Sequence, residues 1–221
     1  VFYDAQRFDT AARIGALALT LARAAGDTDA QARAYRTLSQ ISVDQGRLDR
    51  AVAYARRGLA LPGLGEDERA LLQVRLGRAL ALIPGQESAA RTALYQAQEA
   101  GDVSPLYAEY LTGIIGDSLT DLGAYEEAEI ALEECLRLSC SRPSSTLSSL
   151  LTLERQIATA LGRADPGLAA ERMLSYANLA PLVTSPRVDR QTKEILAASA
   201  PWATVPEMRD ARDRLRALTQ V

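Results

Sequence analysis

Two pairs of arginines carry the most suggestive chemistry in this chain. Arg36 follows Arg33, and Arg78 follows Arg75, each at a spacing of three residues. Residues three apart lie on the same face of an α-helix. A guanidinium group offers a planar fork of donors that holds a carboxylate or phosphate through two hydrogen bonds. The spacing therefore predicts a basic surface for an anionic group. The alternative is that these are ordinary solvated arginines in an arginine-rich chain.

Further polar residues fall at matching helical positions. We expect them to face solvent from the first helix of each successive helix pair. They are Gln40 and Asp44, then Tyr110, Asp117 and Asp121, and finally Thr152 and Gln156. One end of this surface is basic and the other acidic. We therefore expect a ligand whose anionic end lies near Arg36 and Arg75 and whose other end lies near Tyr110.

Catalytic and metal-binding patterns are sparse in this chain. It has no histidine, and its two cysteines are Cys135 and Cys140. Without histidine, a metal site would need a set of acidic and cysteine ligands, and no such spacing occurs. No glycine-rich phosphate loop is present, and no base stands near the serines to activate one. We therefore expect no enzyme, no cofactor and no metal site, and we expect both cysteines to be reduced and structural.

The bulk composition indicates an all-helical protein. The chain has 221 residues, of which 48% are hydrophobic and 5% aromatic, and it lacks the alternating β-branched runs typical of strands. Its net charge is −3, with acids and bases mixed along the chain, whereas nucleic-acid-binding domains usually carry a basic excess. We therefore expect no direct contact with nucleic acid. No long uncharged apolar run or signal peptide occurs, so the expected location is the cytoplasm, away from membranes.

A small residue recurs along the chain at intervals near 40 residues. Its positions are Ala11, Ala51, Ala90, Ala128 and Ala170, at spacings of 40, 39, 38 and 42. Repeats of this length are typical of stacked helix pairs. A small side chain lets two helix backbones approach closely, while larger neighbours fill the groove between them. The pattern predicts an all-α, right-handed superhelical solenoid of about eleven antiparallel helices.

Cap and breaker signals divide this single repeat domain, residues 1–221, into segments. We expect a partial repeat at 1–27, repeats at 28–63, 64–101, 102–143 and 144–182, and a capping region at 183–221. Thr28 and Gln31 form a predicted capping box for the second helix. Trp202 is expected to plug the end of the core. Because the first predicted helix has no partner before it, we expect the chain to be a fragment of a longer protein.

The stretch around residues 115–135 carries a recognisable pattern. Ile115-Gly116, Leu119, Gly123, Tyr125, Ala128 and Leu132 follow one another at the spacing of the tetratricopeptide repeat, which this stretch resembles. The resemblance implies a domain that binds proteins or peptides on its concave face. The repeat length, with the phrases LTLARAAGD (19–27) and VPEMRDARDRLRAL (205–218), also resembles the C-terminal half of bacterial regulators that begin with a helix-turn-helix domain.

This resemblance leaves two functional hypotheses open. The first is the sensory or oligomerising part of a bacterial transcriptional regulator, in which a protein, a peptide or a small anionic ligand favours one of two conformations. The second is a protein-interaction scaffold without DNA-linked output. The asparagines and lysines with which related domains hold a peptide have no counterparts on the first helices of this chain. Asn178 lies on a second helix, and Lys193 is the only lysine. A homodimer is compatible with both hypotheses.

Overall fold

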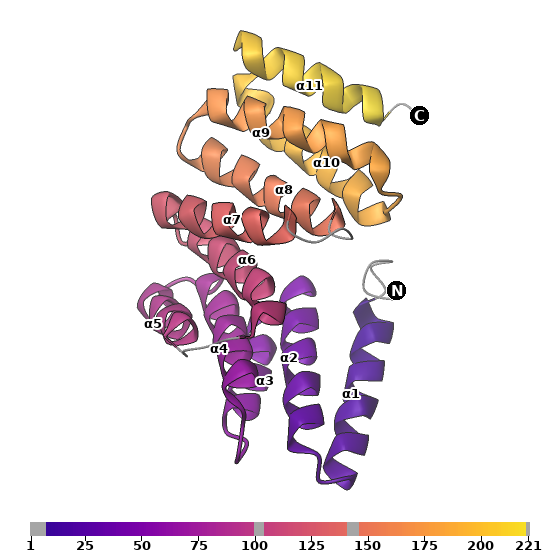
Figure 1. The fold of residues 1–221 in the computed structure, drawn as a ribbon, viewed down its shortest axis with the longest axis vertical. Coiled ribbons are helices and arrows are strands. Elements are labelled where there is room, and N and C mark those ends of the chain that lie inside the picture. Colours follow the sequence, from indigo (N-terminus) through magenta and orange to yellow (C-terminus); the bar gives the residue numbers. More distant parts are fainter. Residues whose placement is uncertain (1–7, 100–103, 141–145, 220–221) are drawn as a thin grey trace. The chain divides into compact units, whose positions relative to one another are not determined.

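The computed structural model describes residues 8–99, 104–140 and 146–219, and these residues form eleven α-helices and two short 3₁₀ helices without any strand. The all-α fold class is therefore confirmed. The chain separates into two compact units, an N-terminal unit of residues 1–122 and a C-terminal unit of residues 123–221 (Figure 1). The division falls inside the repeat predicted at 102–143.

The N-terminal unit contains the first six helices. They are α1 (Phe8–Ala24), α2 (Thr28–Asp44), α3 (Leu48–Leu59), α4 (Glu66–Ala81), α5 (Glu87–Gln98) and α6 (Pro105–Asp121). Neighbours in sequence pack together from α1 to α5, and α4 also contacts α2 and α6. The first helices of three successive pairs, α2, α4 and α6, therefore lie next to one another with α4 between the other two. This layer positions the candidate site.

Small residues at the helix crossings explain the close packing in this unit. Ala51 and Ala90 are completely buried. A Cβ atom built on Gly77 would lie only 2.6 Å from Leu94 Cδ2, so a larger residue there would force the Leu94 side chain of α5 to move. The turn between α2 and α3 uses Gly46 at φ 69°, a left-handed conformation that favours glycine. Of the recurring small residues predicted from the sequence, Ala51 and Ala90 are thus confirmed as packing positions in this unit, whereas Ala11 is partly exposed.

The capping box predicted at Thr28 and Gln31 is wrong by one residue. Asp27 is the N-cap of α2, and its carboxylate accepts a hydrogen bond from the backbone N–H of Ala30 at 2.9 Å. A carboxylate accepts this bond well and also complements the positive end of the helix dipole. Thr28 therefore becomes the first helical residue.

Asp27→Ala should lower the free energy of unfolding by about 1 kcal/mol, because it leaves an N-terminal N–H of α2 without its acceptor. Urea titration followed by circular dichroism measures this change. Asp27→Asn keeps an acceptor oxygen and should stay close to the parent. Equal loss in both variants would mean that the charge, and not the cap hydrogen bond, stabilises α2.

The C-terminal unit contains the remaining helices. They are α7 (Tyr125–Cys140), α8 (Thr146–Gly162), α9 (Pro166–Leu179), η1 (Ala180–Leu182), α10 (Pro186–Ala198), η2 (Ala200–Trp202) and α11 (Pro206–Leu218). Helix α8 packs against α7, α9 and α10, and α9 also packs against α11. The core includes the fully buried Met173, Tyr176 and Leu215, and the half-buried Trp202 packs against it. The predicted role of Trp202 in the core is therefore confirmed.

Candidate partner-binding surface

Arg75 of α4 joins α2 to α6 through its guanidinium group. Its Nε donates a hydrogen bond to the Tyr110 hydroxyl at 2.8 Å, and its Nη2 contacts the same hydroxyl and Gln40 Oε1. The Arg75 Cζ atom also lies 4.9 Å from the centre of the Tyr110 ring. The sequence placed these three residues on one surface, and the structure brings them together. The expected solvent exposure of Arg75 is wrong, because the residue is only 6% exposed.

Arg36 of α2 is held between an acid and two aromatic rings. Its Nε lies 3.3 Å from Glu68 Oε2, and its Cζ lies 5.9 Å and 5.7 Å from the ring centres of Tyr107 and Tyr110. The side chains of Arg36 and Glu68 are 16% and 11% exposed. A partly buried pair of this kind is weakly screened by solvent. The charge of Arg36 is therefore largely balanced within the protein.

Arg78 of α4 contacts the carboxyl end of α6. Its Nη1 forms an ion pair with Asp121 Oδ2 and lies 3.5 Å from the backbone oxygen of Asp117. The sequence placed the arginines at one end of the surface and these aspartates at the other. In the structure Arg78 and Asp121 meet, because α4 and α6 are neighbours.

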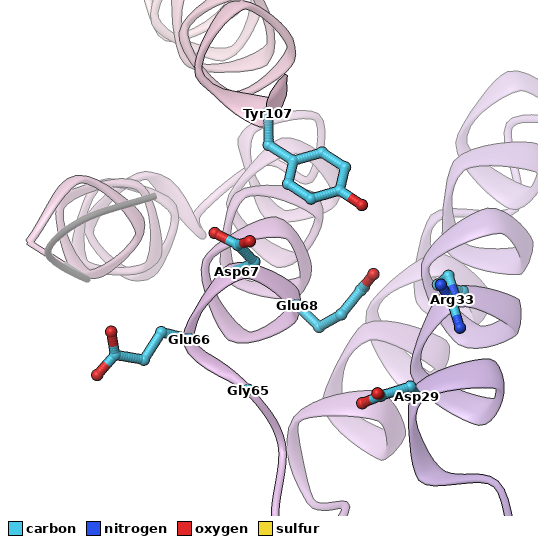
Figure 2. Close-up of a pocket in the computed structure, with 7 residues that line it drawn as sticks. All are labelled: Asp29, Arg33, Gly65, Glu66, Asp67, Glu68 and Tyr107. Atoms are coloured by element: carbon cyan, nitrogen blue, oxygen red, sulfur yellow. The ribbon is translucent and has the colours of Figure 1, made fainter. Parts of the chain in front are cut away.

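A pocket of about 450 Å³ lies beside this cluster, at the first turns of α2, α4 and α6. We call it the acidic pocket, and its lining residues are Asp29, Arg33, Gly65, Glu66, Asp67, Glu68 and Tyr107 (Figure 2). Four of these residues are acidic and one is basic. Even with the neighbouring Arg36 counted, acids outnumber bases two to one. Three of the acids form the first turn of α4 and complement its helix dipole.

The carboxylates of the acidic pocket have different environments. Glu68 extends into the space between Tyr107 and Arg33, whereas Glu66 points away from that space (Figure 2). Asp67 Oδ1 accepts a hydrogen bond from the backbone N–H of Ser104 at 2.9 Å, just before α6 begins. Burial raises the pKa of Glu68 above its ordinary value of 4.5, although Arg36 and Arg33 oppose this shift. Glu68 is therefore a desolvated carboxylate that a bound cation would stabilise.

Glu68→Gln should change how stability depends on pH. Because the pKa of Glu68 is higher in the folded protein than the ordinary value of 4.5, the folded state binds this proton more tightly than the unfolded state. The contribution of Glu68 to stability is thus present at low pH and is lost as pH rises through the raised pKa. Relative to the parent, Glu68→Gln should gain free energy of unfolding as pH rises from 4 to 7.

Urea titrations at several pH values measure this difference. Glu134→Gln is the matched control, because the hydrogen bond from Arg137 lowers the pKa of Glu134. Relative to the parent, this variant should lose free energy of unfolding as pH rises, which is the opposite of Glu68→Gln. A difference between Glu68→Gln and the parent that stays constant with pH would contradict the assigned shift.

The C-terminal unit does not present its predicted residues to solvent. Gln156 is completely buried, and neither of its amide atoms has a hydrogen-bond partner among the described residues. Thr152 is 6% exposed, and its hydroxyl lies 3.4 Å from the sulfur of the buried Cys135. The expectation that both residues face solvent is wrong, because α7, α9 and α10 all pack against α8. Of the remaining predicted residues, Arg33 and Asp44 are exposed, as expected.

Sequence reasoning missed the acidic residues and Tyr107 of the pocket. The available signals were the run Glu66-Asp67-Glu68 at the start of a helix and the three-residue spacing of Tyr107 and Tyr110. Within the residues that the structure describes, no cluster of three or more potential metal ligands occurs. No helix in the same residues is long and apolar enough to cross a membrane.

Residues 113–139 match the family model described as tetratricopeptide repeat. The matched stretch covers the second half of α6, the turn at Gly123 and most of α7. A comparison with curated proteins found no match. The chain therefore carries one stretch similar to a tetratricopeptide repeat within an all-α fold, and this match supports a role in binding proteins or peptides.

Proposed function

We propose that this protein binds a segment of a partner protein on the surface formed by α2, α4 and α6, and that a lysine or arginine side chain of the partner enters the acidic pocket. The repeat match supports protein binding. The observation that carries the choice of a cation is the excess of carboxylates around the pocket. The pocket volume of about 450 Å³ is ample for one long basic side chain.

The chemistry of the pocket suits such a side chain. An ammonium or guanidinium group near Glu68 would give a buried carboxylate a second cationic partner in addition to Arg36. The Tyr107 ring forms part of the wall and offers a face for a cation–π contact. The hydrogen-bonded cluster of Arg75, Gln40 and Tyr110 connects the three helices, so the pocket is largely formed before a partner arrives.

An anionic ligand near Arg36 and Arg75 is the expectation from the sequence, and it stays untested. An anion there would compete with Glu68 for Arg36 and with Gln40 and Tyr110 for Arg75. Because breaking these partly buried contacts has a cost, we favour the cationic side chain. The small anionic ligand becomes an outcome that the experiment below distinguishes.

Selection from a random peptide library on immobilised protein tests the proposal. We expect the selected peptides to share a lysine or arginine at one fixed position, because the acidic pocket favours a basic side chain. Peptides that share aspartate or glutamate instead would support the anionic ligand. Selected peptides without any shared charge would contradict a role of the acidic pocket.

We further propose that this chain is the sensory or oligomerising part of a bacterial transcriptional regulator. Partner binding would then be linked to transcription. The repeat length near 40 residues and the resemblance of residues 19–27 and 205–218 to such regulators support this context. Binding could regulate an attached domain only by favouring one of two conformations. A helix-turn-helix pattern in the coding sequence upstream of Val1 would support the regulator, and its absence there would favour an interaction scaffold.

A further inference from the structure

Helix α1 exposes a stripe of large apolar side chains. Ile14, Leu17 and Leu21 are 49%, 59% and 62% exposed, and they are three of the six large hydrophobic residues that are strongly exposed in the described part of the chain. Leu19 and Ala22 of the same helix are buried. The stripe is therefore a second apolar face, separate from the one that packs into the N-terminal unit. Exposed apolar residues gathered in this way mark an interaction surface.

The spacing of the stripe indicates that its partner is another helix. Ile14, Leu17, Leu21 and Ala24 are separated by three, four and three residues, which is the spacing of the contact positions in a coiled coil. The exposed Ala18 borders the stripe and allows a second helix to approach closely. No charged residue interrupts these positions.

We propose that a second copy of this chain docks on the stripe, with the two α1 helices antiparallel around a twofold axis. An axis near position 19 places Leu17 of one copy opposite Leu21 of the other, and Ile14 opposite Ala24. Each large residue at the ends then meets a small one, so the stripe is complementary to itself, as a twofold interface requires.

Charge complementarity supports the antiparallel direction. Arg13 and Asp27 are both exposed, and they flank the two ends of the stripe. In the antiparallel pair, Arg13 of each copy lies toward Asp27 of the other. A parallel pair would instead place Arg13 of one copy beside Arg13 of the other. Opposite charges across the edge of the contact favour the antiparallel pair.

The size of the contact limits its strength. Helix α1 has 17 residues, which corresponds to a length of roughly 25 Å. A single pair of helices of this length buries less area than a standard stable interface. The dimer should therefore be weak and should form only as protein concentration rises.

Sedimentation equilibrium of residues 1–221, from low micromolar to several hundred micromolar protein, tests the proposal. The parent should pass from monomer to dimer over this range. Leu17→Glu and Leu21→Lys each place an unpaired charge in the apolar contact and should raise the dissociation constant at least roughly tenfold. Both positions are exposed, so both variants should keep the helical circular dichroism spectrum of the parent.

Mixing the two variants tests the pairing itself. Because position 17 of one copy faces position 21 of the other, Leu17→Glu and Leu21→Lys should form a mixed dimer that neither forms alone. Leu182→Glu is the control, since Leu182 is 70% exposed in the C-terminal unit and should leave the dimer intact. A parent that stays monomeric, a dimer insensitive to Leu17→Glu, or rescue only between Leu17→Glu and Leu17→Lys would each overturn the proposed pairing.

Discussion

Replacing Ala128 with leucine should lower the free energy of unfolding of the C-terminal unit by about 1 to 3 kcal/mol. Ala128 is completely buried and occupies the recurring small position within the stretch that matches the tetratricopeptide repeat. A leucine there must displace neighbouring side chains or push two helices apart. The cost arises from overpacking, since leucine itself suits a helix as well as most residues do.

The single tryptophan makes this measurement specific to one unit. Trp202 packs against the core of the C-terminal unit, so its fluorescence during urea titration reports on that unit alone. Ala197→Leu is the matched control, because Ala197 is exposed on α10 in the same unit. We expect the control to keep the midpoint of the parent. An equal midpoint for Ala128→Leu would mean that Ala128 does not lie at a close helix crossing.

Glu68→Gln should weaken binding of the peptides selected for a basic residue by about 2 kcal/mol or more, which is roughly thirtyfold in the dissociation constant. The substitution keeps the shape of the side chain and removes the buried charge that the partner's cation would contact. Arg36 then loses the carboxylate that balances its charge and repels a basic side chain near the pocket.

Glu87→Gln provides the control for this loss. Glu87 lies at the start of α5 in the same unit, outside the acidic pocket, and its substitution changes the net charge by the same amount. Isothermal titration calorimetry should show that Glu87→Gln binds the selected peptides with the same affinity as the parent. Equal weakening in both variants would indicate a general electrostatic attraction between a basic peptide and an acidic protein.

The sequence was sufficient for most of the fold because helix caps and small residues are local signals. The recurring alanines marked the crossings, and Ala51, Ala90 and Ala128 are all completely buried. Where two cap residues are adjacent, as at Asp27 and Thr28, the pattern could not decide between them. The division into two compact units was also missed, because it depends on contacts between elements and no break in composition marks it.

The candidate site was predicted only in part. Helical spacing predicted that Arg36, Arg75 and Tyr110 lie on one surface, and the structure agrees. The spacing could not show that these arginines already have internal partners, because Glu68 reaches Arg36 from a neighbouring helix. It also failed for Gln156, since the burial of a polar residue depends on how three other helices cover it. The sign of the charge around the pocket therefore emerged only from the structure.

A double-mutant cycle between the acidic pocket and a selected peptide tests the central claim most directly. The four titrations combine parent protein or Glu68→Gln with the peptide or with a version whose shared basic residue is replaced by an uncharged residue of similar length. We predict that each change alone weakens binding and that the second change adds almost nothing after the first, which gives a coupling energy of about 1.5 kcal/mol or more. Losses that simply add would contradict the account, because the basic side chain would then bind somewhere other than the pocket beside Glu68.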